Sequence, residues 1–372
     1  PAPLVGSSRT YNSGAADGTY GQYIAPVSRD QAIGSGEGPL YLLQMAKSAG
    51  FRSNVGFSEM AGAATEVELE IRRGADGALL GTLTRTVPPF SNVQLNRVLE
   101  TLGIDSTPNA FGVVRVISGG VVVAYASVVD NQTGDAIYVP GLPADTVEEV
   151  VIPVVAKVLG AAGTSWRSDV RIFNGGPAAE TVVLTYRTYT GGQLAEEAIS
   201  EQVPAGKVLA IDDVVGALGR DGESGTLTVE ADDGSGQLVV TSRTYNATLG
   251  GTYGQFVPAV ANGSESATVL HLERSNAFRS NLGIAELSGS PAAVTWRLRD
   301  GSGALLGTRT VELEPHELVQ VNDLFGAAGA GDRDNARVDI IVTSGPGAVA
   351  AYGSVVDNRT GDAIFVPAQP LP

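Results

Sequence analysis

The sequence has no cysteine and only two histidines, His271 and His316, among its 372 residues. The lack of thiols excludes disulfides, thiolate catalysis and cysteine-based zinc or iron–sulfur sites. Two histidines leave little scope for histidine-based metal or acid–base chemistry. No apolar run approaches the roughly 18 to 20 residues that a membrane-spanning helix needs. These absences argue against a typical enzyme, and we expect no catalytic residues and no membrane insertion.

Positive charge is also scarce, because 40 acidic residues face 24 basic ones and the net charge is −16. Such a chain is repelled by nucleic-acid backbones and by anionic membranes, so we expect neither as a partner. Lysine is nearly absent while arginine is common, which we interpret as the bias of a high-GC genome. Together with the acidity and the missing cysteine, this favours an exported bacterial protein, extracellular or at the cell surface.

What the sequence does contain is internal repetition. One short motif, which ends in asparagine, occurs at residues 8–12, 127–131, 242–246 and 354–358. The four asparagines are separated by 119, 115 and 112 residues. Each interval is the length of one small domain.

The four copies are of two alternating kinds. Copies one and three lead into Gly-Thr-Tyr-Gly-Gln, at residues 18–22 and 251–255. Copies two and four lead into Thr-Gly-Asp-Ala-Ile, at residues 133–137 and 360–364. The units between the copies therefore follow the order A, B, A.

Alternating apolar and polar residues, as at 67–72 and 294–299, are typical of strands with one buried face. We therefore predict an all-β protein of three tandem immunoglobulin-like antiparallel β-sandwich domains, with a spare β segment at each end. Short helical turns are expected after Asn96, Asp212 and Asn322, which are suitable N-caps. The predicted boundaries are 1–18 for an orphan N-terminal strand, 19–140 for sandwich 1 (type A), 141–258 for sandwich 2 (type B) and 259–372 for sandwich 3 (type A) with the C-terminal strand.

Residues 163–174, followed by the Val/Leu/Tyr strand at 182–186, resemble the tandem immunoglobulin-like β-sandwich repeats of secreted bacterial surface proteins. The resemblance implies an extracellular structural, adhesive or ligand-binding module. It carries over no catalytic residues.

The loops at residues 130–135 and 357–362 each place two carboxylates, an amide and a hydroxyl within six positions. Oxygen-rich loops of this kind can hold Ca²⁺, the one cofactor worth considering here. Their spacing does not match an EF-hand, and Asn and Asp beside Gly are also what a tight turn requires. We favour turn chemistry, with a weak calcium site as the alternative. The candidate ligands are Asp130, Asp135, Asp357 and Asp362.

Arg52, Arg167 and Arg279 recur behind aromatic residues at matched positions, and we interpret them as structural: stacked on those rings or hydrogen-bonded across the sheet. His316 lies next to acids, but no nucleophile motif accompanies it, so we interpret it as a loop residue. A carboxylate-based secreted hydrolase is the weakest reading, since a repeated small sandwich rarely supplies one deep cleft.

Two non-enzymatic functions compete. The first is an extracellular structural protein: a rod of three sandwiches that assembles head-to-tail with copies of itself into a filament or surface array. The second is an adhesin or carbohydrate-binding stalk module of a larger secreted protein, with surface polysaccharide as its partner. Exposed aromatics on one sheet face would favour the second function, but Phe, Trp and Tyr make up only 6% of the chain.

The filament hypothesis rests on the chain ends, because four motif copies surround only three sandwich cores. The first copy has no preceding sandwich to close, and the fourth leads into a strand with no following sandwich. Unpaired strand edges are usually covered, and docking on a neighbouring subunit by strand addition would cover them. A piece of a longer repeat array, or a terminal strand that folds back on its own first domain, are the alternatives. The expected assembly residues are Leu4, Ser8, Tyr11 and Asn12 at one end and Ile364, Phe365 and Val366 at the other.

Overall fold

The all-β prediction is confirmed by the computed structural model, which describes residues 4–15, 18–160, 163–232, 234 and 236–371. Strand β5 (Thr65–Arg73) illustrates why these residues form sheets. Its apolar residues Val67, Leu69 and Ile71 are buried, while Glu68 and Glu70 between them are only half-buried. This period-two pattern puts one face of the sheet in a core and the other in water.

Sandwich 1 packs the sheet β6–β5–β8–β3 against the sheet β10–β9–β4–β7. Its core contains Phe57, Leu69 and Val114, all buried. Its elements besides β5 are β3 (Leu40–Lys47), β4 (Phe51–Glu59), β6 (Leu79–Val87), β7 (Asn92–Leu95), α1 (Val98–Thr101), β8 (Thr107–Ser118), β9 (Val122–Asp130) and β10 (Ala136–Pro140).

In sandwich 2 the two sheets are joined at one corner, because β12 pairs with both β13 and β17. The chain therefore forms one continuous nine-stranded sheet folded over its own core. Its elements are β11 (Asp145–Val147), β12 (Glu149–Leu159), β13 (Ser165–Asn174), β14 (Glu180–Thr190), β15 (Gln193–Val203), β16 (Val208–Ile211), α2 (Val214–Ala217), β17 (Glu223–Ala231), β18 (Gly236–Thr248) and β19 (Gly251–Pro258).

Sandwich 3 repeats the topology of sandwich 1, with the sheets β23–β22–β25–β20–β28 and β24–β21–β26–β27. The added strand β28 pairs along the edge of β20. Its elements are β20 (Ser266–Arg274), β21 (Phe278–Glu286), β22 (Ala292–Arg299), β23 (Leu305–Leu313), β24 (Leu318–Val321), α3 (Leu324–Ala327), β25 (Arg333–Ser344), β26 (Val349–Asp357), β27 (Ala363–Pro367) and β28 (Gln369–Pro370).

The three short helices occur where the sequence predicts them, but each starts one residue later than expected. The N-cap positions are Arg97, Asp213 and Asp323, each with a φ near +50°. The Asp213 and Asp323 carboxylates accept hydrogen bonds from Gly216 N and Gly326 N. An aspartate in this role satisfies one of the free N–H groups of the first helical turn.

The N-terminal boundary differs from the predicted one. Strands β1 (Ser8–Ala15) and β2 (Gly18–Ile24) pair with each other in an antiparallel hairpin. Residues 19–24 therefore belong to this hairpin and not to sandwich 1, to which the range 19–140 assigned them. A short 3₁₀ turn, η1 (Arg29–Gln31), follows before β3.

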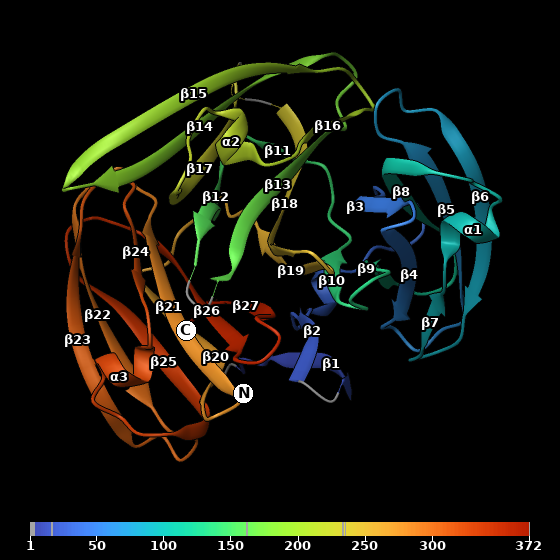
Figure 1. Ribbon diagram of the computed structural model, residues 1–372. Helices are drawn as coiled ribbons and strands as arrows, with labels where there is room; N and C mark the ends of the chain where they lie inside the picture. The colour runs from blue at the N-terminus through green and yellow to red at the C-terminus, as the bar shows by residue number, and fades with distance from the viewer. Residues whose placement is uncertain (1–3, 16–17, 161–162, 233, 235, 372) are drawn as a thin grey trace.

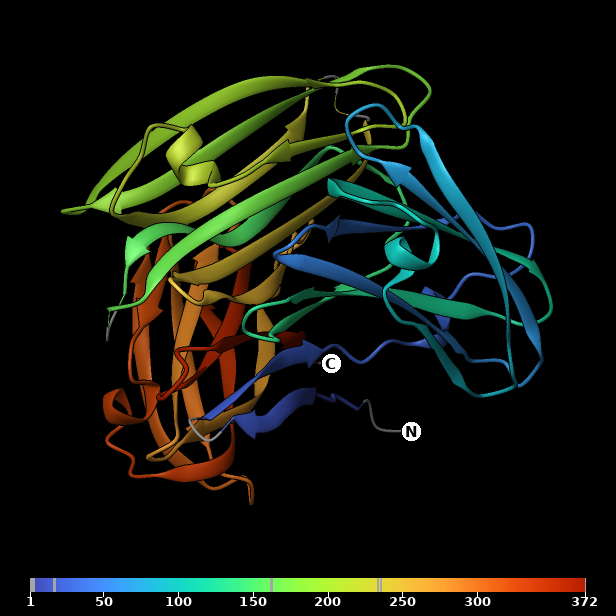
Figure 2. The same cartoon turned by 45° about the vertical axis from the view of Figure 1, so that its right-hand side comes forward.

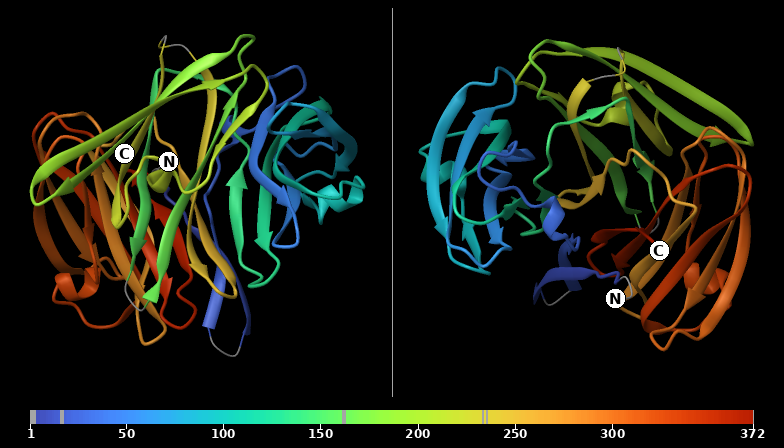
Figure 3. Two further views of the ribbon diagram at one scale, coloured as in Figure 1. Left: turned by 45° about the horizontal axis from the view of Figure 1, so that its top comes forward. Right: turned by 180° about the vertical axis from the view of Figure 1, so that it is seen from behind.

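The three sandwiches do not form the expected rod. They surround a common centre, where β2, β10, β19 and β27 gather (Figure 1). Turned views show sandwich 2 bridging the other two, with the N-terminal hairpin beside sandwich 3 (Figures 2 and 3). An apolar interface that includes Leu43, Phe111 and Phe173 joins sandwich 1 to sandwich 2. A second apolar interface joins sandwich 2 to sandwich 3, because Tyr352 and Phe365 of sandwich 3 pack into the hydrophobic core of sandwich 2.

Candidate functional site

The centre of the molecule is built from the four copies of the repeated motif, each of which forms one β-hairpin. These hairpins are β1–β2, β9–β10, β18–β19 and β26–β27, and we call them together the hub. Strand β2 lies beside β10 and β27, and β19 lies beside the same two strands. The ring is therefore closed, with copies of the two kinds alternating around it.

Two equivalent sets of hydrogen bonds hold the hub together. Asp130 Oδ2 accepts from Thr252 N and Thr252 Oγ1, both at 2.8 Å. Asp357 Oδ2 accepts from Thr19 N at 2.8 Å and from Thr19 Oγ1 at 3.0 Å. The aspartates lie in the second and fourth copies and their threonine partners in the third and first. Copies two and four therefore supply the carboxylate acceptors, and copies three and one supply the threonine donors.

A buried aspartate follows in each of these loops. Asp135 Oδ2 accepts from Gly254 N at 2.6 Å, and Asp362 Oδ2 accepts from Gly21 N at 2.9 Å. A Cβ at Gly21 would lie only 2.3 Å from the carbonyl oxygen of Thr10, so glycine is required where the strands approach this closely.

Two arginines complete the contacts. Arg243, of sandwich 2, lies over the ring of Phe51 in sandwich 1, 4.9 Å from its centroid. Arg9, of the N-terminal hairpin, lies over Phe278 in sandwich 3 at the same distance. Each guanidinium also donates to the hub threonine of its own hairpin, Thr252 or Thr19.

The four hub aspartates have opposite pKa shifts. Burial would raise the pKa of Asp130 and Asp357, but backbone N–H donors outweigh it and hold both below the ordinary value. Burial raises the pKa of Asp135 well above its usual range, and the charge of Asp362 adds to this. Burial likewise raises the pKa of Asp362, to about 7.

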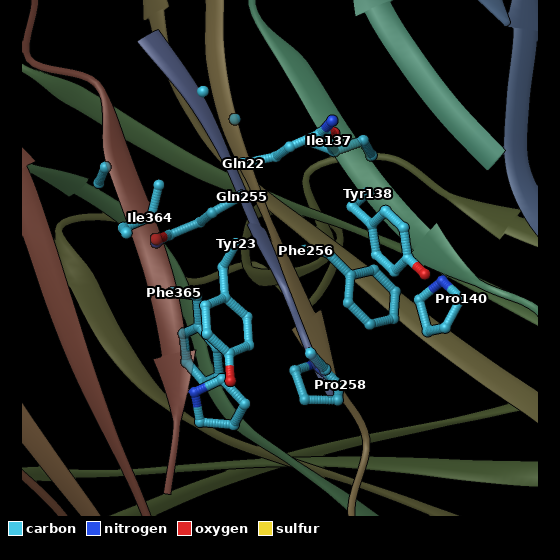
Figure 4. A pocket seen from close by; sticks show the side chains of 15 residues that line it. Gln22, Tyr23, Ile137, Tyr138, Pro140, Gln255, Phe256, Pro258, Ile364 and Phe365 are labelled. Carbon is cyan, nitrogen blue, oxygen red and sulfur yellow. The ribbon is translucent and has the colours of Figure 1, made fainter. Parts of the chain in front are cut away.

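Inside the hub lies a small apolar pocket of about 100 Å³, the hub pocket. Aromatic rings and prolines from all four hairpins face it (Figure 4). Its volume suits one side chain and lies well below the 300 Å³ or more of small-molecule sites. The rings and prolines are Tyr23, Tyr138, Phe256, Phe365, Pro140, Pro258 and Pro367.

The structure places the expected assembly residues differently from the prediction. Ser8, Tyr11 and Asn12 lie in β1, which is paired with β2 of its own chain, while Leu4 precedes it and is exposed. Ile364, Phe365 and Val366 lie in β27, which pairs with β26 and is buried. Neither β1 nor β27 is therefore a spare strand, because the N-terminal hairpin of the same chain forms the fourth hairpin of the hub. The two ends also meet directly, where Gln369 Oε1 accepts from Gly6 N.

The calcium candidates lie together in the hub, in two pairs. Asp130 and Asp357 use both oxygens as hydrogen-bond acceptors, since Oδ1 of each binds N–H groups of its own turn. Asp135 and Asp362 each keep one buried oxygen, Oδ1, without a partner. Within the described ranges, no group of three or more His, Asp or Glu side chains could hold a metal ion. Calcium binding stays a prediction.

A second, larger hollow lies where sandwich 2 covers one sheet of sandwich 3. This interdomain cleft has a volume of about 590 Å³. Its roof comes from sandwich 2 and includes Trp166 and Gln255. Its floor comes from β21, β24 and β26 of sandwich 3 and the turn after β24. The floor residues are Arg279, Asn281, Gln320, Asn322, Tyr352 and Ser354.

The same six residue types occupy the equivalent face of sandwich 1: Arg52, Asn54, Gln94, Asn96, Tyr125 and Ser127. The clearest difference in burial is at the tyrosine, since Tyr125 is half-exposed where Tyr352 is buried. This polar set is hard to predict from the sequence, because its members are scattered over three strands. Their recurrence at matched positions of the first and third units is the signal that could have found it.

Of the two arrangements predicted for the arginines at matched positions, the hydrogen bond across the sheet is the one observed. Arg167 donates to Asp213 Oδ2 at 3.2 Å. Arg52 and Arg279 donate to Asn131 Oδ1 and Asn358 Oδ1, both at 2.7 Å. The guanidinium groups that stack on Phe51 and Phe278 belong instead to Arg243 and Arg9. His316 lies in a loop, as expected, and its carbonyl accepts from Thr226 of sandwich 2.

No protein-family model matches this sequence, and no curated protein does. One similar solved structure is described as a biofilm associated protein, BSP domain, at 10% identity and a TM-score of 0.16. The similarity covers 97% of this chain and 64% of that chain. No helix in the described part of the chain is long and apolar enough to span a membrane.

Proposed function

We propose that this protein is a non-enzymatic extracellular binding module that acts in adhesion at a bacterial surface, with its three sandwiches held as one body. One observation carries the proposal: the hub ties both chain ends and all three sandwiches together, so that the polar interdomain cleft has a defined geometry. A preorganised site loses less freedom when it binds its ligand. The acidic, cysteine-free composition supports a location outside the cell.

Filament assembly, the first of the two sequence-based hypotheses, loses its main support. Strand addition needs an unpaired segment at each end, whereas the hairpin β1–β2 completes the hub of its own chain. Assembly would have to exchange this hairpin between copies. The intramolecular partner is always close by, which favours the closed form. Adhesion is therefore the better supported of the two functions.

Sedimentation with intact cells tests the proposal. Purified protein is mixed with cells of the producing organism, and with insoluble polysaccharide extracted from their surface. We expect the folded protein to co-sediment with both, and antibodies to label unpermeabilised cells. Protein found only in the cytosol, and absent from both pellets, would contradict the proposal.

A further inference from the structure

The interdomain cleft has the size of a ligand site. Its volume of about 590 Å³ lies within the range of small-molecule pockets, roughly 300 to 1,000 Å³. Two sandwiches contribute to it, and such sites concentrate between domains. The hub pocket, by comparison, is several times smaller.

The floor of this cleft is preformed. Tyr352 Oη donates to Gln320 Oε1 at 3.2 Å, and Gln320 Nε2 donates to Asn322 Oδ1 at 2.8 Å. Sandwich 1 repeats this chain of bonds on its uncovered face, with Tyr125, Gln94 and Asn96, at 2.9 and 2.8 Å. The arrangement forms without a roof, so the floor is a property of the sheet itself.

The polar groups of the cleft have unused hydrogen-bonding capacity. Asn281 and Asn322 use their side-chain oxygens inside the protein, Asn281 Oδ1 by accepting from Asp323 N at 3.2 Å. Their amide NH₂ groups, which can donate two bonds each, remain for a ligand.

The cleft also offers apolar surface beside these groups. Trp166 Nε1 donates to Thr164 Oγ1 at 3.0 Å, which leaves the carbon face of its half-buried indole for packing. Val154 and Val158 of β12 extend this apolar part of the roof. A suitable ligand therefore has C–H faces as well as a dense set of hydroxyl donors and acceptors.

Charge narrows the class of ligand further. The guanidinium of Arg279 donates to Asn358 Oδ1, and Asp323, which lines the same cleft, pairs with Arg274 at 3.7 Å. The whole chain carries a net charge of −16, which disfavours phosphorylated or polyanionic molecules. The ligand should be neutral.

From these observations we infer that the interdomain cleft is a binding site for a neutral oligosaccharide. The amides of Asn281 and Asn322 bind sugar hydroxyls, and Trp166 packs on a sugar face. The uncovered floor of sandwich 1 lacks the roof and binds far more weakly. This inference rests on the proposed adhesive function and names its ligand class.

The probe is a panel of neutral oligosaccharides, comprising gluco-, galacto-, manno- and N-acetylglucosamine-based chains, screened on an array and titrated by calorimetry up to millimolar concentration. We expect at least one of them to bind. Asn281→Asp keeps the acceptor oxygen for Asp323 N but removes the NH₂ donor, and should weaken binding by about tenfold or more. Trp166→Ala should do the same through lost packing.

The matched control is Asn54→Asp, the same change in the uncovered floor of sandwich 1, which should leave the affinity unchanged. Circular dichroism and unfolding curves show whether each variant is folded. If no oligosaccharide binds the folded protein, or if binding survives Asn281→Asp in a folded variant, the inference is overturned. An equal loss with Asn54→Asp overturns it too, because it would place the site on sandwich 1.

These outcomes are separable from failure of the proposed function. If the protein and its Asn281→Asp variant sediment equally with cells, adhesion stands and the cleft is not its site. If oligosaccharides bind the cleft but the protein neither sediments with cells nor labels their surface, the site stands and the adhesive function fails.

Discussion

The buried aspartates of the hub illustrate how one loop places two carboxylates in opposite environments. Asp130 and Asp135 are five residues apart, yet backbone donors lower the pKa of the first and burial raises that of the second. The same contrast separates Asp357 from Asp362. The partner of each carboxylate, not its place in the turn, decides whether its charged form is stabilised.

Asp362 should make the stability of the protein depend on pH. Its pKa rises from an ordinary value of 3.8 to about 7 on folding, so the folded chain holds a proton that the unfolded chain has lost. The resulting stabilisation is fully present below pH 3.8 and is lost as the pH rises through about 7. One such proton changes the free energy of unfolding by at most about 1.4 kcal/mol per pH unit.

We therefore expect Asp362→Asn to flatten the fall in unfolding free energy between pH 3.8 and about pH 7. Urea denaturation at a series of pH values measures this slope. Asp357→Asn is the control, because its pKa is shifted in the opposite direction. An unchanged slope in Asp362→Asn would show that this carboxyl does not titrate in the folded protein.

Thr19 is a second residue that can be tested singly, since its hydroxyl donates to Asp357 and accepts from Arg9. Hydrogen bonds to charged groups contribute about 1.5 to 3 kcal/mol, and Thr19→Ala should lower the free energy of unfolding by that order. Thr252→Ala should lower the free energy of unfolding by the same amount, because the Thr252 hydroxyl likewise donates to Asp130 and accepts from Arg243. Thr10→Ala, on the exposed face of β1, is the control, and chemical denaturation is the measurement. Unequal effects of the two hub threonines would contradict the equivalence of the two halves.

At the scale of elements, the N-terminal hairpin takes the place of a hairpin that a fourth sandwich would supply. Its partners in sandwich 3, Asp357 and Phe278, correspond to Asp130 and Phe51 in sandwich 1, which β18–β19 of sandwich 2 covers. The hairpin is thus a structural component of sandwich 3, although it lies at the opposite end of the chain.

Deleting residues 1–24 should therefore loosen β26 and β27 and leave sandwich 1 largely unaffected. The reason is that Asp362 loses its donor Gly21 N and Asp357 loses both donors on Thr19, and buried carboxylate oxygens left without donors are costly. Hydrogen exchange by mass spectrometry should show faster exchange in β26–β27 than in the equivalent β9–β10. Deletion of residues 1–5, which precede the hairpin, is the control. Equal protection of the two hairpins in the 1–24 deletion would show that the N-terminal hairpin does not support sandwich 3.

At the scale of the whole molecule, closure of the hub determines the shape. A compact chain of this length has a radius of gyration of about 21 Å. We expect small-angle scattering to give a value only slightly above this, with no growth as concentration rises. A row of three sandwiches would give a clearly larger radius, and a filament would be visible by electron microscopy. Either result would contradict the closed arrangement.

Much of the fold could be predicted because its signals are local. Alternation in β5, the turns that follow Asp130 and Asp357, and the capped helical turns all arise from residues within a few positions of one another. The spacing of the repeats then determined the number of sandwiches and the order A, B, A. What remained ambiguous was the fate of the chain ends, since an extra hairpin can pair within a chain or between chains with the same local sequence.

Only the tertiary structure decided how the repeats meet. The bond from Gly21 N to Asp362 spans 341 positions and that from Thr252 N to Asp130 spans 122, so no window of sequence contains both partners. The sequence by itself determined the strands, the three sandwich cores and the complementary loops, because these depend on period and turn chemistry. The closed hub, the opposite pKa shifts and the roofed cleft depend on which faces become buried against each other, and burial between distant segments is a property of the folded molecule alone.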